Sequence, residues 1–176
     1  MFGLFKKKPD NVGVLSKQIK VDTTELAHTL IDEFVDHILV DSAKAAKDYD
    51  IDTTPAPSYE PKIQLYQLTV LLMAILCVEK DIPQYLAVRI TIEEGYFSLS
   101  SDPTGARSEQ VKFAMIELNE LIVRVENAGK SLEWAQNWFR EIGINVSNPA
   151  SLALFSMHWI DLYIAEVKSL TRFTPV

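Results

Sequence analysis

Apolar residues recur every three or four positions along most of the chain, and this spacing predicts helices separated by polar breaks. The first run begins at Leu26 and Leu30, directly after Asp22 and Glu25, whose three-residue spacing is typical of a helix start. The same reasoning applies to each later run. Helices are therefore expected over 23–48, 61–80, 82–99, 107–128, 132–142 and from Pro149 to about Arg172.

The second expected helix is apolar nearly all round. Its stretch "IQLYQLTVLLMAILCV" has 16 uncharged residues between Lys62 and Glu79. A membrane-spanning helix needs about 20 apolar residues, so this run is short for that purpose. A helix without a polar face must be covered on several sides. We therefore predict a central core helix of a soluble protein.

The segment 82–99 admits two interpretations. Val88, Ile90 and Ile92 alternate with polar residues, and a turn at Glu94 and Gly95 would make a short β-hairpin over 86–99. Helical spacing instead places Tyr85, Val88 and Ile92 on one apolar strip. We favour the helix and keep the hairpin as the alternative.

The motif "AGKS" at 128–131 has the end of a phosphate-binding loop but not its beginning. The full motif needs a glycine five residues before its second glycine, and Arg124 occupies that position. Residues 128–130 are instead expected to end the helix over 107–128. Ser131 would then be the N-cap of the next helix.

These elements predict an all-α fold with one domain, an irregular antiparallel bundle of about five to six helices. The 176 residues, 48% of them hydrophobic, suffice for a sizeable core. The helical domain would cover 22–176 with a proline-rich loop at 49–61, after a flexible basic leader at 1–21. Cys77 is the single cysteine, which excludes an intramolecular disulfide and a cysteine-rich zinc site.

The net charge of −7 is concentrated in one part of the sequence. Residues 21–60 hold ten acidic side chains and two lysines, whereas residues 1–20 hold five lysines and one aspartate. Overall acidity argues against a nucleic-acid-binding protein that relies on phosphate contacts. It favours attraction of a basic protein partner.

The stretch "HTLIDEFVDHILVD" at 28–41 carries two of the three histidines among several carboxylates. On a helix these side chains form two rows on opposite borders of the apolar face, His28–Asp32–Asp36 and Glu33–His37–Asp41. Ligands divided in this way do not converge on one ion, and the chain has no Glu-x-x-His motif. We therefore expect no metal, cofactor or catalytic residue here. The expected partner-binding residues are Asp32, Asp36, Asp41, Asp48, Asp50 and Asp52.

The leading interpretation is a cytoplasmic, non-enzymatic protein-binding module, either an inhibitor or immunity-like protein or an adaptor. The first alternative is a helical-bundle enzyme or metal-binding protein that uses His28, Glu33, His37, His158 and Glu166. Glu33, His37 and His158 would be its metal ligands. The second is a peripheral membrane adaptor, because "MFGLFKKK" joins apolar residues to three lysines that would attract anionic lipid weakly through residues 2–8.

Glu166 is the one acidic residue expected within a core stripe. On a helix it falls between Phe155 and Trp159 in angle, on the apolar side. A buried carboxylate is normally compensated, so we expect a basic side chain beside it. The alternative is a catalytic carboxyl group with a raised pKa.

Overall fold

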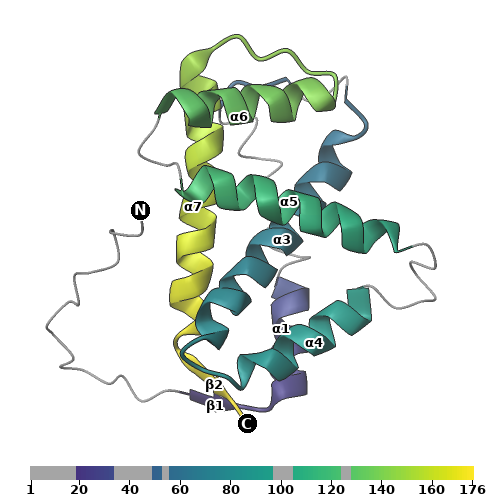
Figure 1. Cartoon of the computed structure of the whole chain (residues 1–176), viewed down its shortest axis with the longest axis vertical. Helices are drawn as coiled ribbons and strands as arrows, with labels where there is room; N and C mark the ends of the chain where they lie inside the picture. The colour runs from purple at the N-terminus through teal and green to yellow at the C-terminus, as the bar shows by residue number, and fades with distance from the viewer. Residues whose placement is uncertain (1–18, 34–48, 53–55, 97–104, 124–127) are drawn as a thin grey trace, which may run out of the picture.

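The computed structural model describes residues 19–33, 49–52, 56–96, 105–123 and 128–176. The described part is mainly helical, which confirms the predicted all-α bundle (Figure 1). One small parallel sheet joins the two ends of this part. The elements are β1 (Ile19–Val21), α1 (Thr23–Glu33), α3 (Tyr59–Glu79), α4 (Tyr85–Tyr96), α5 (Ala106–Val123), α6 (Ala128–Glu141), α7 (Pro149–Leu170) and β2 (Phe173–Pro175).

Helix α3 is the central element, as its all-round apolar sequence predicts. It packs against α4, α5 and α7, and twelve of its 21 residues are buried. Its first half contributes Ile63, Tyr66 and Val70 to one core cluster, and its second half contributes Leu72 and Ile75 to another. Helices α5 and α7 also contribute to both clusters, with Val111 and Leu170 in the second, so these three helices join the two halves of the core.

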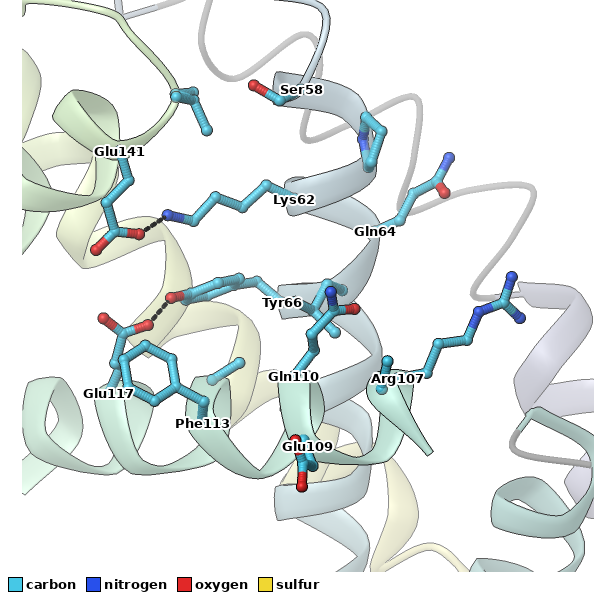
Figure 2. Close-up of a pocket in the computed structure, with 15 residues that line it drawn as sticks. Ser58, Lys62, Gln64, Tyr66, Arg107, Glu109, Gln110, Phe113, Glu117 and Glu141 are labelled. Carbon is cyan, nitrogen blue, oxygen red and sulfur yellow. Dashed lines mark hydrogen bonds and ion pairs between the residues drawn. The ribbon is translucent and has the colours of Figure 1, made fainter. Parts of the chain in front are cut away.

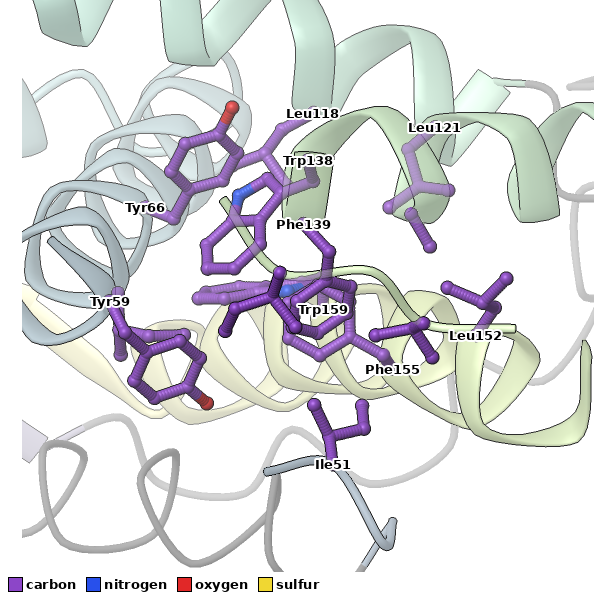
Figure 3. Packing of buried hydrophobic residues seen from close by; sticks show 14 of the residues in the cluster. Ile51, Tyr59, Tyr66, Leu118, Leu121, Trp138, Phe139, Leu152, Phe155 and Trp159 are labelled. Atoms are coloured by element: carbon purple, nitrogen blue, oxygen red, sulfur yellow. The ribbon is translucent and has the colours of Figure 1, made fainter. Parts of the chain in front are cut away.

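The first cluster, called here the aromatic cluster, lies between α3, α5, α6 and α7 (Figure 3). Phe155 is near its centre, with ring centroids 4.5 Å from Phe139 and 4.9 Å from Trp138. Tyr66 lies at the edge, 5.7 Å from both Trp138 and Trp159. Edge-to-face and tilted pairs of this kind add directional preference to apolar burial, so they fix how α6 and α7 sit on α3.

The second cluster lies at the other end of α3, where α1 and α4 pack on each other. Helix α4 places Tyr85, Val88 and Ile92 on one buried face and leaves Ile90 exposed. The hairpin alternative for 86–99 is therefore wrong, since the burial follows helical spacing and not alternation. On the partly exposed side of α4, Arg89 forms ion pairs with Glu79 of α3 and with Glu93, one turn further along α4.

Most predicted helix boundaries that fall within the described residues agree with the structure to within a few residues, whereas the ends of the helices predicted over 82–99 and 107–128 reach residues outside them. Asn148 caps α7 by accepting a hydrogen bond from the Ala150 N–H at 3.0 Å, and Pro149 follows as the first helical residue. At the start of α1, the Asp22 carboxylate accepts hydrogen bonds from the backbone N–H groups of Thr24 and Glu25. The predicted helix over 23–48 is confirmed for Thr23–Glu33, and 34–48 lie outside the described residues.

The prediction that Ser131 caps a helix over 132–142 is wrong. Helix α6 already begins at Ala128, so Ser131 lies inside it. Its carbonyl oxygen accepts a hydrogen bond of 2.9 Å from the Ser156 hydroxyl of α7. One glycine within a helix costs only about 1 kcal/mol, and packing of this turn on α7 outweighs that cost.

The sheet was not predicted. Strands β1 and β2 are parallel and only three residues long, with Ile19 opposite Phe173. Beside it, the buried Tyr85 hydroxyl of α4 donates to the Leu170 carbonyl oxygen at 2.6 Å, and burial raises the pKa of Tyr85 to about 12. The strand β1 includes the last residues of the predicted leader 1–21, whereas residues 1–18 lie outside the described ranges.

Helix α3 is also the one described helix long and apolar enough to cross a membrane, by length and composition alone. Of its most apolar stretch, 61% is buried inside the structure. A core helix passes the same test, so this finding is weak evidence for a membrane span.

Burial of α3 leads to a first prediction. Leu72, which is 2% exposed, becomes an uncompensated buried charge in Leu72→Asp. The substitution should lower the free energy of unfolding by roughly 3 kcal/mol or more. Urea denaturation followed by circular dichroism measures the change. Leu86→Asp on the exposed side of α4 is the control and should have little effect. Equal stabilities of the two variants would contradict the core position of α3.

Candidate functional site

The predicted docking residues are only partly within the described ranges. Asp32 is exposed on α1, and Asp50 and Asp52 are exposed in the segment that precedes α3. Helix α1 packs in the second cluster, whereas Ile51 packs in the aromatic cluster. The described acids thus lie beside different parts of the core. The other three predicted docking residues, Asp36, Asp41 and Asp48, lie outside the described residues, so the docking surface stays a prediction.

The residues of the metal alternative are likewise not brought together in the described structure. Glu33 and His28 are exposed on α1, and His37 lies outside the described ranges. His158 is half-buried on α7, with its ring centroid 6.4 Å from that of Tyr49 and 5.5 Å from that of Trp159. Among the described residues, no three histidine, cysteine, aspartate or glutamate side chains are grouped so that they could hold a metal ion.

Glu166 was expected from the sequence to lie in the core stripe beside a basic side chain. It is half-buried on α7, but no basic side chain is paired with it within the described parts of the chain. Burial raises the pKa of this carboxyl group, and the nearby Glu33 carboxylate raises it further. Among the described residues Glu166 thus faces a like charge. Residues 34–48 lie outside them, so the expected basic partner stays a prediction.

An open cleft of about 1090 Å³ lies between α3 and α5 and reaches the end of α6 (Figure 2). It combines aromatic rings with charged groups of both signs. Three helices contribute to it, so residues distant in the sequence meet there. Its charged and aromatic lining includes Lys62, Tyr66, Phe113, Glu117 and Glu141.

Lys62 of α3 is held at one end of the cleft by several groups of α6. Its ammonium group forms an ion pair with Glu141 and lies 3.4 Å from the Trp138 carbonyl oxygen. It also lies 4.8 Å from the Trp138 ring centroid and 5.7 Å from that of Tyr66, within the range of cation–π attraction. Lys62 therefore fastens the end of α6 to α3.

Tyr66 lies one helical turn after Lys62, and Figure 2 shows both side chains extending from α3 toward two carboxylates. The Tyr66 hydroxyl donates a hydrogen bond to Glu117 of α5. Burial is the main cause that raises the pKa of Tyr66, and Glu117 adds to it, so the phenol stays protonated. The hydroxyl is thus a fixed donor at the floor of the cleft.

The carboxyl group of Glu117 has a pKa above its usual value. Its pKa is raised chiefly by burial and also by the Glu141 carboxylate, while the Tyr66 hydrogen bond and the Lys62 charge act in the opposite direction. The raising effects prevail, so its negative charge is incompletely compensated. Carboxyl groups with raised pKa values in clefts are common at functional sites, although structural networks also produce them.

The outer face of α5 beside this cleft carries exposed apolar side chains. Phe113, Ile116 and Val123 are 60%, 61% and 72% exposed, and their spacing places them on one row. Phe113 also lines the cleft, whereas the other two continue the row away from it. Sequence reasoning missed this row because it sought only the core stripe. Three large apolar residues off that stripe were the available signal.

The pKa of Glu117 leads to a second prediction. Its folded-state pKa lies above the usual value, so the folded protein binds more protons than the unfolded chain in the window between the two values. This contribution to stability grows as the pH falls through that window and is absent at neutral pH. Glu117→Gln retains an acceptor for Tyr66 without the charge. It should melt at a higher temperature than wild type at pH 7, with the gain shrinking toward pH 4.

Glu133→Gln, on the exposed surface of α6, is the matched control and should melt like wild type at every pH. A Glu117→Gln protein less stable than wild type at pH 7 would show that the carboxylate charge is fully compensated. Calorimetric melting curves at several pH values decide between the two.

Comparison with known proteins does not assign the chain to a family. No protein-family model matches it, and no curated protein or solved structure is significantly similar to it. We therefore infer a function from the cleft and from the exposed apolar row on α5.

Proposed function

We propose that the chain is a non-enzymatic protein-binding module, and that it docks a segment of a basic partner protein on the outer face of α5 and in the adjoining cleft. The observation that carries this proposal is the row formed by Phe113, Ile116 and Val123. Single exposed apolar residues are ordinary on protein surfaces, but rows beside a cleft are typical of interaction sites.

The charges around the row support a basic partner. Glu109 and Glu120 lie on the same side of α5 as the apolar residues, and Glu117 and Glu141 line the cleft. Positive groups are present too: Lys112 lies near the row, Arg107 lines the cleft, and Lys62 is bound to Glu141. Among the described residues acidic groups here outnumber basic ones by four to three, and acidic residues are also in excess in the whole sequence. A partner segment with apolar anchors and lysine or arginine side chains complements both features.

Selection of peptides from a random display library tests this proposal without a known partner. Peptides enriched on the wild-type protein should combine aromatic or aliphatic residues with lysine or arginine. Their binding should weaken as salt is raised. Ile116→Asp together with Val123→Asp should reduce the affinity about tenfold or more, because central apolar anchors dominate binding energy.

Helix α7 offers the matched control. Met157 and Ile164 are also exposed apolar residues seven positions apart, on a helix face away from the described cleft lining. Met157→Asp together with Ile164→Asp should leave peptide binding unchanged. Enriched peptides that lose affinity equally in both double variants, or in neither, would contradict docking on α5.

The acidic surface predicted from the sequence is a second candidate for contact with the same kind of partner. Asp32, Asp50 and Asp52 are exposed and so are accessible to one. Replacing Asp32, Asp36 and Asp41 by asparagine should then slow association and flatten its dependence on ionic strength, while dissociation changes little. Stopped-flow measurements with an enriched basic peptide check this. An unchanged association rate at low salt would exclude that surface.

A further inference from the structure

The inner end of the cleft holds more negative than positive charge. Glu117 and Glu141 approach it from α5 and α6, and Lys62 is the one described cation that lowers the pKa of Glu117. Lys62, however, is already engaged by Glu141, the Trp138 carbonyl oxygen and two aromatic rings. One carboxylate charge therefore lacks an ion-pair partner of its own when both acids are ionised.

Glu117 is accessible to a ligand from the cleft. It is half-buried, and within the described residues its hydrogen-bond donor is the Tyr66 hydroxyl. A carboxylate has about four acceptor positions, so one donor leaves most of them open. Because Tyr66 approaches from the α3 side, a second donor would enter through the cleft itself (Figure 2).

Phe113 provides an apolar wall beside this carboxylate. It precedes Glu117 by four residues on α5, so the two side chains lie on neighbouring turns of the same face. Figure 2 shows the Phe113 ring next to Glu117, and both residues line the cleft. An apolar surface next to a poorly compensated carboxylate matches a ligand that joins a cation to an apolar stem.

We propose that the inner end of the cleft binds an ammonium or guanidinium group on an apolar stem, with Glu117 as its counter-ion and Phe113 as the wall for the stem. This inference rests on the proposed function, since a lysine or arginine of the docked segment would supply the group. Lys62 stays on Glu141, so the incoming cation adds to the network and displaces nothing.

Binding should depend on pH because only the ionised carboxyl group attracts the cation. Lys62 and Tyr66 face Glu117 from α3, Glu141 faces it from α6, and Glu120 lies on its own helix. Burial raises the pKa of Glu117, so this carboxyl group takes up a proton at a higher pH than an ordinary glutamate does. The bound cation opposes that protonation, and affinity is therefore lost as the pH falls through the pKa of Glu117.

The test compares phenethylammonium with phenethyl alcohol, two probes of nearly equal shape, of which the first is a cation and the second is uncharged. Titration of the full chain, labelled with ¹⁵N, should shift the amide signals around Phe113 and Glu117. At pH 7 the cation should bind about tenfold more tightly than the alcohol, because hydrogen bonds to charged groups are the stronger kind. This preference should vanish at low pH.

Glu117→Gln should abolish the preference for the cation and its dependence on pH, and the Glu133→Gln control should keep both. Equal affinity for the two probes in wild type, or a preference unaffected by Glu117→Gln, would overturn the inference. Glu117→Gln retains the Tyr66 acceptor and its melting curve is measured separately, so loss of folding is distinguished from loss of binding.

Failure here is distinguishable from failure of the proposed function. Ile116 and Val123 do not line the cleft, so their aspartate variants test docking on α5 and should leave probe binding intact. Basic peptides that need the α5 row but bind Glu117→Gln as tightly as wild type would overturn the cation site alone.

Discussion

The structure depends on burying α3 on every side. A helix of 21 residues is about 31 Å long, and this one has no polar face that could lie toward solvent along most of that length. Each neighbouring helix covers part of it, α4 and α7 toward the second cluster, α5 and α7 toward the aromatic cluster. The bundle is irregular because its helices are arranged around one central element and not as equal partners in a ring.

The same constraint explains where the cleft lies. The first turns of α3 carry Lys62 and Tyr66, whose polar ends cannot be placed in an apolar core without partners. Those turns pass the edge of the aromatic cluster, where Tyr66 packs its ring inward and directs its hydroxyl toward α5. The polar groups of α5 and α6 meet it there. The polar end of an otherwise apolar helix thus produces a charged site next to the core.

The sequence predicted those features that depend on local periodicity. The helices, the helix start at Asp22 and the helix from Pro149 follow from side-chain spacing and hydrogen-bonding chemistry within a few residues. Features that depend on tertiary contact were missed. Three-residue strands have too little pattern to detect, and the early start of α6 depends on Ser156 of another helix. The hairpin alternative failed because two of its alternating apolar residues, Val88 and Ile92, are four positions apart and share one helical face, which leaves Ile90 exposed.

The candidate site was beyond sequence reasoning for the same reason. Glu117, Glu141 and Lys62 are far apart in the chain, and each alone is an ordinary charged residue on an amphipathic helix. The acids at 28–41 were predicted as a docking surface because they are close together in the sequence. Side chains adjacent along a helix, however, are distributed over several faces. Glu166 was expected in a core stripe and is half-buried, and the charged neighbour that the described residues give it is the acidic Glu33, which no local pattern indicates.

The exposed rows on α5 and α7 show why the cleft matters to the functional argument. Both helices carry large apolar residues at similar spacing on their outer faces, so hydrophobic exposure alone does not separate them. Among the described residues, the row on α5 reaches the cleft at Phe113, and the poorly compensated carboxylate of Glu117 lies beside it. Apolar surface supplies affinity without direction, whereas a half-buried charge rejects ligands that leave it unpaired. A raised pKa means that the ionised form of Glu117 is disfavoured by folding, and in the proposed site a bound cation would make that charge favourable.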